Sequence, residues 1–105
     1  DLGYEVQVNN SHTDPKRTAG LYGIKDNFAA VAADNQWFTL TIRVEGKRIV
    51  TRVDGKVISD FTEPADWTPP KGFAHRKLSH GTVALQGHDP ECEVHYRNLK
   101  IRLLP

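Results

Sequence analysis

Alternation of apolar and polar positions is the dominant pattern of this chain, and it predicts β-strands. The stretch Tyr4–Val8 has the two-residue period of a half-buried strand. Thr18–Ile24 is a short apolar segment whose two glycines suit the close approach of another backbone or of a ligand. The one stretch that tolerates a helix, 28–33, is too short and is predicted to be a loop or a single turn. The predicted fold class is therefore all-β.

The centre of the chain predicts a three-stranded antiparallel meander. Its first and longest alternation is Trp37–Val44, and a turn at Glu45-Gly46 leads into Lys47–Val53. Asp54-Gly55 is typical of a type I′ hairpin turn and leads into Lys56–Phe61. These strands carry Val, Ile and Phe on one side and Thr, Arg and Lys on the other, so we expect one core face and one solvated face.

The closing stretch Gly81–Leu104 predicts two more strands around one turn. Val83 and Leu85 alternate in the first arm, and Val94 and Tyr96 alternate in the second. The later apolar residues continue on the opposite parity, so a β-bulge is expected near Asn98. The other face of this pair is either a ligand surface or an ordinary solvated face, and it carries Gln86, Glu93, His95 and Arg97.

The length of 105 residues predicts one domain, 1–105, with a long loop over 62–79. Trp67 in that loop either caps the sheet or offers an aromatic platform for a sugar, and Tyr22 either packs in the core or stacks on a sugar ring. His12 and Asp14 lie in a second loop, 10–17, which either leans over a neighbouring site or only connects two strands. The chain contains no Met, which indicates that its start has been trimmed.

Charge and composition give no indication of a nucleic-acid or membrane partner. The 14 basic and 13 acidic residues give no overall charge that would attract nucleic acid or an anionic membrane. No apolar run approaches the roughly 20 residues of a membrane-spanning helix. The single cysteine, Cys92, excludes an internal disulfide, and its position between two glutamates disfavours a reactive thiolate.

The motifs of several enzyme classes are missing from the sequence. It has no Gly-rich phosphate loop, no Cys-x-x-Cys pair and no His-Glu-x-x-His helix, which sets aside kinases, zinc fingers and zincins. Four residues offer nitrogen and oxygen metal ligands without a diagnostic spacing, namely Glu5, His88, Asp89 and His95. We therefore expect no cofactor, with a divalent metal as the alternative. No carboxylate cluster supports hydrolysis by two paired carboxylates.

A series of short motifs resembles the 3-keto-disaccharide hydrolase family, whose domain is a concanavalin-like or β-glucanase-like jelly roll. The resemblance runs nearly end to end, with the motifs in the family's order: Gly3–Gln7, Ala19–Gly23, Trp37 with Leu40–Val44, Gly46–Ile49, Val53–Val57, Gly81–His88 and Tyr96–Leu99. The sequence departs from the family at Phe38, where the family often has Asn, and at Asp54, where it has Asn. The resemblance implies the C-terminal half of the family domain, and hence an incomplete antiparallel β-sandwich.

The resemblance also implies a site and a reaction. The reaction is cleavage of 3-keto-disaccharides or other 3-keto-glycosides by base-assisted elimination followed by hydration. The implied catalytic residues are Glu5 and His88, one as base and the other as acid, and Arg97 as the partner of the enolate or of a ring hydroxyl, with a metal as the alternative electrophile. The implied substrate-binding residues are Gln7, His12, Tyr22, Trp67 and Gln86.

The alternative is a non-catalytic carbohydrate-binding or interaction module of the same fold. In either case the implied partner is an oligosaccharide or glycoside, with neither nucleic acid nor membrane. Pairing with the missing N-terminal half or with a second copy is a further expectation. The family implies a periplasmic or secreted location, and activity of this chain alone is left open.

Overall fold

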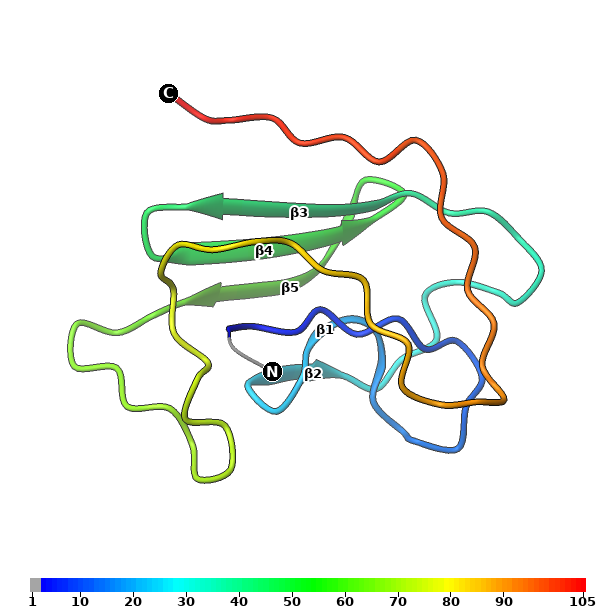
Figure 1. The fold of residues 1–105 in the computed structure, drawn as a ribbon, viewed down its shortest axis with the longest axis horizontal. Helices are drawn as coiled ribbons and strands as arrows, with labels where there is room; N and C mark the ends of the chain where they lie inside the picture. The colour runs from blue at the N-terminus through cyan, green and yellow to red at the C-terminus, as the bar shows by residue number, and fades with distance from the viewer. Residues whose placement is uncertain (1–2) are drawn as a thin grey trace.

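The computed structural model describes residues 3–105, which form an all-β fold of two antiparallel sheets. The smaller sheet pairs β1 (Arg17–Leu21) with β2 (Lys25–Asn27). The larger has the order β3-β4-β5, formed by Leu40–Glu45, Arg48–Val53 and Lys56–Thr62. Figure 1 shows the smaller sheet lying below β5, and this arrangement is that of a partial β-sandwich. Residues 3–105 contain no helix, and so none long enough to cross a membrane.

The predicted meander is confirmed, although β3 begins at Leu40 and not at Trp37, and the first turn lies one residue later than predicted. In β3 and β4, Leu40 pairs with Val53 and Glu45 with Arg48, as a tight turn at Gly46-Lys47 requires. The second turn has φ angles of 49° at Asp54 and 82° at Gly55, the two positive values of a type I′ hairpin. Its Asp54 side chain also accepts a hydrogen bond from the Thr39 backbone N–H at 2.9 Å, which fastens the turn to the start of β3.

The first predicted strand is present as an extended segment along β1. Val6 forms one bridge with Leu21, and hydrogen bonds of 2.9 and 2.8 Å join Gln7 to Gly20 and Ala19. The glycine prediction is confirmed at Gly20, where a Cβ would meet the backbone nitrogen of Asn27 in β2 at 2.5 Å. The sequence pattern missed β2, because its three residues are polar and too few to show a period.

A buried hydroxyl joins the two sheets. The Thr51 Oγ1 donates to the Ala19 carbonyl at 2.6 Å and accepts from the Ser59 N–H at 3.1 Å. Thr51 is fully buried among the residues of the small core between the sheets: Thr18, Ala19, Leu21, Ile49, Val53 and Ser59. Val50 is also buried, but on the other face of β4. Ala19 has φ of 70°, which accommodates the irregular register of β1. The core therefore sits between β1 and β4, while Ile42 and Val44 on the edge strand β3 stay about half exposed.

The two strands predicted for the closing stretch are wrong for this structure, and so is the bulge between strand residues. From residue 79 to the end the backbone is irregular, and the apolar residues that should be buried are exposed, among them Val83, Leu99, Ile101 and Leu103. The two arms diverge: one crosses β4 in the view of Figure 1, and the other runs along the top. A strand needs a hydrogen-bonded neighbour, and alternation alone supplies none. Asn98 does adopt φ of 55°, a local irregularity of the kind expected there.

Candidate functional site

Arg76 organises a polar cluster beside the turn between β1 and β2. Its guanidinium is largely buried and donates to the Gly3 carbonyl at 2.6 Å and to the Tyr22 carbonyl at 3.4 Å. The same group pairs with the Glu5 carboxylate at 3.4 Å, and that carboxylate is 30% exposed. The long loop thereby closes over the first strand segment. Glu5 is left with one side toward Arg76 and the other toward solvent.

Tyr22 extends the cluster toward the 10–17 loop. Its hydroxyl donates to Asp14 Oδ2 at 3.1 Å, and the Lys16 ammonium lies 4.2 Å from the centre of its ring. The hydrogen bond to Asp14, together with burial, raises the pKa of the Tyr22 hydroxyl. The Lys16 N–H is the main cause that lowers the pKa of Asp14. Lys16 already covers the ring of Tyr22, so a sugar would have to displace this cation to stack on that face.

Gln7 and His12 border the same cluster. Gln7 lies on the same side of its segment as Glu5, two residues away, and its Nε2 donates to the Lys16 carbonyl at 3.5 Å. The His12 Nδ1 accepts from the Asp14 N–H at 3.1 Å, while its Nε2 contacts Asp89 Oδ2 at 2.6 Å. Four of the predicted site residues are therefore gathered around Arg76 and the 10–17 loop: Glu5, Gln7, His12 and Tyr22.

Gln86, His88 and Arg97 lie on the closing stretch and are exposed. The Arg97 guanidinium lies 4.0 Å from the centre of the Trp37 ring, a cation–π contact. Within residues 3–105 no hydrogen bond or ion pair joins these three side chains to Glu5. His88 adjoins Asp89, the residue that contacts His12. The closing stretch, which carries these three residues, therefore contacts the 10–17 loop through the His12–Asp89 pair.

Trp67 packs at the end of the large sheet. Its ring meets Phe61 edge-on with centroids 5.2 Å apart, and its Nε1 donates to the Arg76 carbonyl at 2.7 Å. Tyr4 adds a further aromatic contact with Phe61 at 6.2 Å. This geometry is that of a cap that also fixes the backbone of Arg76. The indole contributes to the site by holding Arg76 in place.

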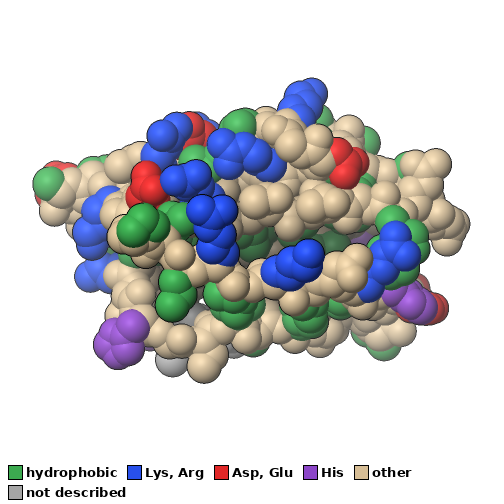
Figure 2. All heavy atoms as spheres, turned by 90° about the horizontal axis from the view of Figure 1, so that it is seen from above, with side chains coloured by type: hydrophobic (Ala, Val, Ile, Leu, Met, Phe, Trp, Pro, Cys, Tyr) green, Lys and Arg blue, Asp and Glu red, His purple; other side chains and the backbone are tan. Residues whose placement is uncertain are grey.

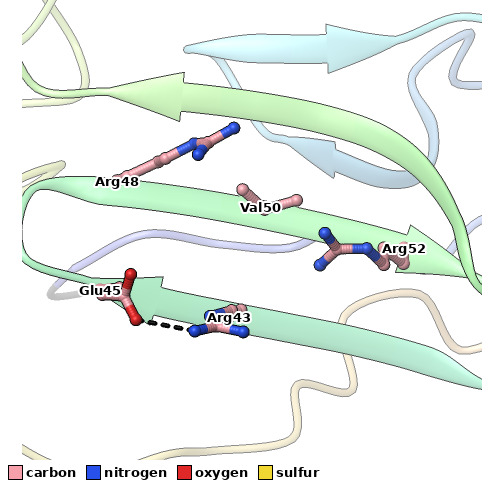
Figure 3. A pocket seen from close by; sticks show the side chains of 5 residues that line it. All are labelled: Arg43, Glu45, Arg48, Val50 and Arg52. Atoms are coloured by element: carbon pink, nitrogen blue, oxygen red, sulfur yellow. Dashed lines mark hydrogen bonds and ion pairs between the residues drawn. The ribbon is translucent and has the colours of Figure 1, made fainter. Parts of the chain in front are cut away.

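Two hollows mark the surface near these elements. One, of about 250 Å³, is lined by Gly72, Phe73, Ala74, His75 and Arg76, so it adjoins the Glu5–Arg76 pair. The other, of about 230 Å³, lies over the outer face of the large sheet, where Arg43, Arg48 and Arg52 surround Val50 (Figure 3). Figure 2 views the molecule from above the orientation of Figure 1, and several Lys and Arg side chains lie on the face that it shows.

The arginine hollow is largely neutralised by carboxylates. Arg43 pairs with Glu45 at 2.7 Å, and Arg48 binds both oxygens of Asp60 at 2.8 and 2.6 Å. These pairs neutralise two of the three arginines, and Arg52 has no such ion pair within residues 3–105. The hollow beside Arg76 is the better candidate site, because Phe73 gives it an aromatic wall and its lining residue Arg76 pairs with Glu5.

Sequence reasoning named Asp14 with His12 in the 10–17 loop but missed Arg76 and Lys16 as members of the cluster. Arg76 was visible only as part of a basic run in a long loop. Its role depends on two backbone carbonyls, at Gly3 and Tyr22, which no side-chain pattern encodes. A large loop containing one arginine among prolines and aromatic residues is the nearest signal that the sequence offers.

Comparison with known families gives one match. The family model of the 3-keto-alpha-glucoside-1,2-lyase-like domain matches residues 1–102, nearly the whole chain. No curated protein matches the chain significantly. No solved structure matches it significantly either.

Proposed function

The chain belongs to the 3-keto-alpha-glucoside-1,2-lyase-like domain family, and from this premise we propose that it cleaves glycosides whose sugar ring carries a ketone at C3. The family match over residues 1–102 is the observation that carries the proposal. Membership supports a carbohydrate-active role in the broad sense. The cluster around Arg76 adds a carboxylate, a buried cation and neighbouring amide groups, which are the kinds of group that the reaction needs.

The reaction uses the acidity that a C3 ketone gives to the proton on C2. A base removes that proton, and the electrons form an enolate with the C3 oxygen. The enolate expels the glycosidic oxygen from C1, which takes a proton from an acid. Water then adds across the new double bond, with its oxygen at C1 and a proton at C2, and the net result is hydrolysis. A cation close to the C3 oxygen stabilises the enolate.

We assign the sugar to the hollow beside Arg76, with Glu5 as the base. The Glu5 carboxylate is partly exposed on the solvent side, and the Arg76 guanidinium 3.4 Å away supplies positive charge. Arg76 therefore takes the electrostatic role that the family resemblance gave to Arg97. We keep His88 as the acid and Gln7 and Gln86 as hydrogen-bonding partners of the sugar hydroxyls.

The proposal is tested with a 3-keto-α-glucoside and its unoxidised parent in D₂O. We expect cleavage of the keto sugar alone, with deuterium incorporated at C2. Glu5→Gln should lower the rate by roughly 100-fold or more, whereas Glu45→Gln, an exposed control on β3, should keep it. Far-ultraviolet circular dichroism of both variants verifies that they fold.

Three results would contradict the proposal. If the double variant Glu5→Gln with His88→Ala cleaved the keto sugar at the rate of the unmodified chain, neither residue would be the base or the acid. Cleavage without deuterium at C2 would exclude elimination. Equal affinity for the 3-keto sugar and its unoxidised parent, with cleavage of neither, would instead indicate a carbohydrate-binding module.

A further inference from the structure

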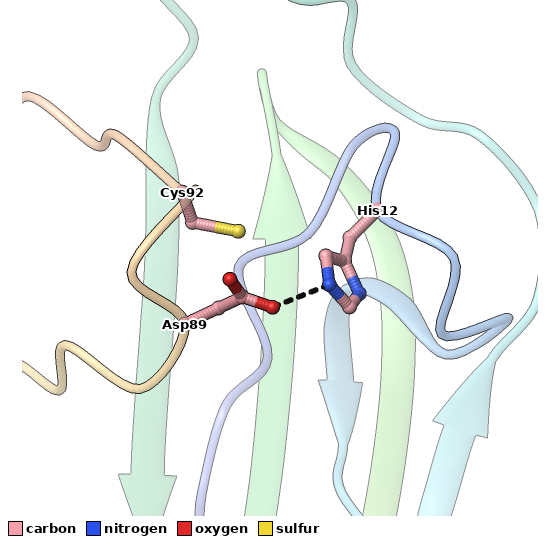
Figure 4. A group of neighbouring side chains, drawn as sticks. All are labelled: His12, Asp89 and Cys92. Carbon is pink, nitrogen blue, oxygen red and sulfur yellow. Dashed lines mark ion pairs between the residues drawn. The ribbon is translucent and has the colours of Figure 1, made fainter.

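Three side chains that can bind a metal meet where the closing stretch contacts the 10–17 loop. They are His12, Asp89 and Cys92, and their ligand atoms all lie within 4.8 Å of one another. Figure 4 shows the Asp89 and Cys92 side chains both pointing toward the imidazole of His12. His12 comes from one end of the chain and the other two residues from the other end, so the fold creates this group.

The turn that carries Asp89 and Cys92 is held by its own hydrogen bonds. The Cys92 N–H donates to the Asp89 carbonyl at 3.1 Å, which folds the backbone back and places both side chains on one side. The Glu91 N–H donates to Asp89 Oδ1 at 2.9 Å. This bond occupies one carboxylate oxygen and leaves Oδ2 directed at His12. Two of the three ligands are thus oriented before an ion arrives.

His12 is oriented by the loop on the other side. Its backbone N–H donates to Asn9 Oδ1 at 2.8 Å, and Asn9 Nδ2 in turn donates to the Asp14 and Lys16 carbonyls at 2.9 and 2.7 Å. These bonds make a compact loop around one asparagine. The imidazole is consequently presented to the closing stretch by a structure that does not depend on the metal.

The combination of sulfur, nitrogen and oxygen identifies the class of ion. Zinc binds thiolate at about 2.3 Å and imidazole or carboxylate at about 2.0 to 2.2 Å in tetrahedral sites. Magnesium and calcium favour oxygen ligands only. Three protein ligands leave a fourth position for water or for a ligand oxygen. The flanking Glu91 and Glu93 add negative charge that attracts a cation.

We propose that His12, Asp89 and Cys92 bind one zinc ion, which clasps the closing stretch to the 10–17 loop. Binding replaces the 2.6 Å contact of His12 Nε2 with Asp89 by bonds from both residues to the metal. The thiol releases one proton to solvent. The imidazole proton moves from Nε2 to Nδ1, so the Asp14 N–H loses its present acceptor there. This exchange opposes binding and limits the affinity.

The whole chain, stripped of metal with a chelator, is titrated with zinc and, separately, with cobalt. We expect one ion per chain, release of about one proton to the buffer from the thiol, and a thiolate-to-cobalt absorption band in the near ultraviolet. Cys92→Ser should abolish that band, and Cys92→Ser and His12→Gln should each weaken zinc binding at least tenfold. His95→Ala is the matched control, since His95 also contacts a carboxylate, that of Glu93, on the same stretch.

Hydrogen exchange distinguishes a clasp from an incidental ion. Zinc should slow exchange of backbone amides around residues 86–95 in the unmodified chain and in His95→Ala, and leave Cys92→Ser unchanged. The proposal is overturned if zinc binds all these variants equally, if cobalt shows no thiolate band, or if zinc leaves the exchange of this stretch unaltered. None of these measurements depends on sugar cleavage. They therefore test the zinc site independently of the proposed reaction.

Discussion

At the scale of single residues, the hydroxyl of Tyr4 makes the stability of the fold depend on pH. Its hydroxyl donates to Glu63 Oε1 at 2.8 Å, and the same oxygen accepts from the Leu78 N–H at 2.6 Å. Burial, followed by the bond to the Glu63 carboxylate, raises the pKa of Tyr4 well above the value of 10.0 for a free tyrosine. This hydrogen bond holds the first strand segment against the end of β5.

The raised pKa of Tyr4 predicts a loss of stability in alkali. Above about pH 10 the unfolded chain loses the tyrosine proton while the folded chain keeps it, so the free energy of unfolding falls as pH rises. Tyr4→Phe should make the decline between pH 9 and pH 11 shallower, as measured by urea unfolding. Tyr96→Phe, on the exposed closing stretch, should leave the decline as it is. Equal slopes in the two variants would contradict the prediction.

Single residues also show what the sequence could and could not reveal about the candidate site. The family resemblance implied Glu5 and Gln7 as site residues, and the structure places Glu5 against Arg76 and Gln7 against the 10–17 loop. Arg76 itself was not predicted, because its partners are carbonyls at Gly3 and Tyr22, far from it in sequence. The position of a loop arginine follows from tertiary packing, and a single sequence contains no period that records it.

At the scale of elements, local patterns predicted the meander and failed for the closing stretch. Asp54-Gly55 and Gly46-Lys47 fix their hairpins through turn chemistry that depends only on neighbouring residues. The strands predicted around 82–86 and 93–97 require a partner backbone, and the arms diverge in this structure. Alternation shows that these segments are suited to strands. The partner that would make them strands has to come from elsewhere.

The buried hydroxyl of Thr51 is the element-scale contact that we expect to matter most for the packing of the two sheets. Thr51→Val should leave the Ala19 carbonyl and the Ser59 N–H without this partner and lower the free energy of unfolding by about 1–3 kcal/mol. Thr51→Ser keeps the hydroxyl and should lose less. Urea titrations of both variants give the difference. A valine variant as stable as the serine variant would show that the hydroxyl contributes little.

At the scale of the whole molecule, the exposed apolar side chains predict self-association. Ile101 and Leu103 are 81% and 90% exposed, and β3 is an open edge of the large sheet. Such surfaces commonly pair with another chain. Sedimentation of the unmodified chain should show dimers or larger species at micromolar concentration, and Ile101→Lys with Leu103→Lys should shift it toward monomer.

A control for this experiment is Thr82→Lys, which adds one charge to the same stretch while keeping its apolar side chains. We expect this variant to associate as the unmodified chain does. A chain that is monomeric at every concentration, or a double variant that associates unchanged, would show that the exposed residues do not form a contact between copies.

The hydrogen bonds that join the first strand segment to Glu63 and Arg76 imply an order of folding. The meander pairs neighbours along the chain, whereas Tyr4 reaches Glu63 across 59 positions and Gly3 meets Arg76 across 73. Closing long loops costs chain entropy before any contact is gained, and contacts between distant residues slow folding. We therefore expect β3 to β5 to form first and the Arg76 cluster to assemble last. The groups proposed to act on the sugar would then be among the final parts of the chain to reach their places.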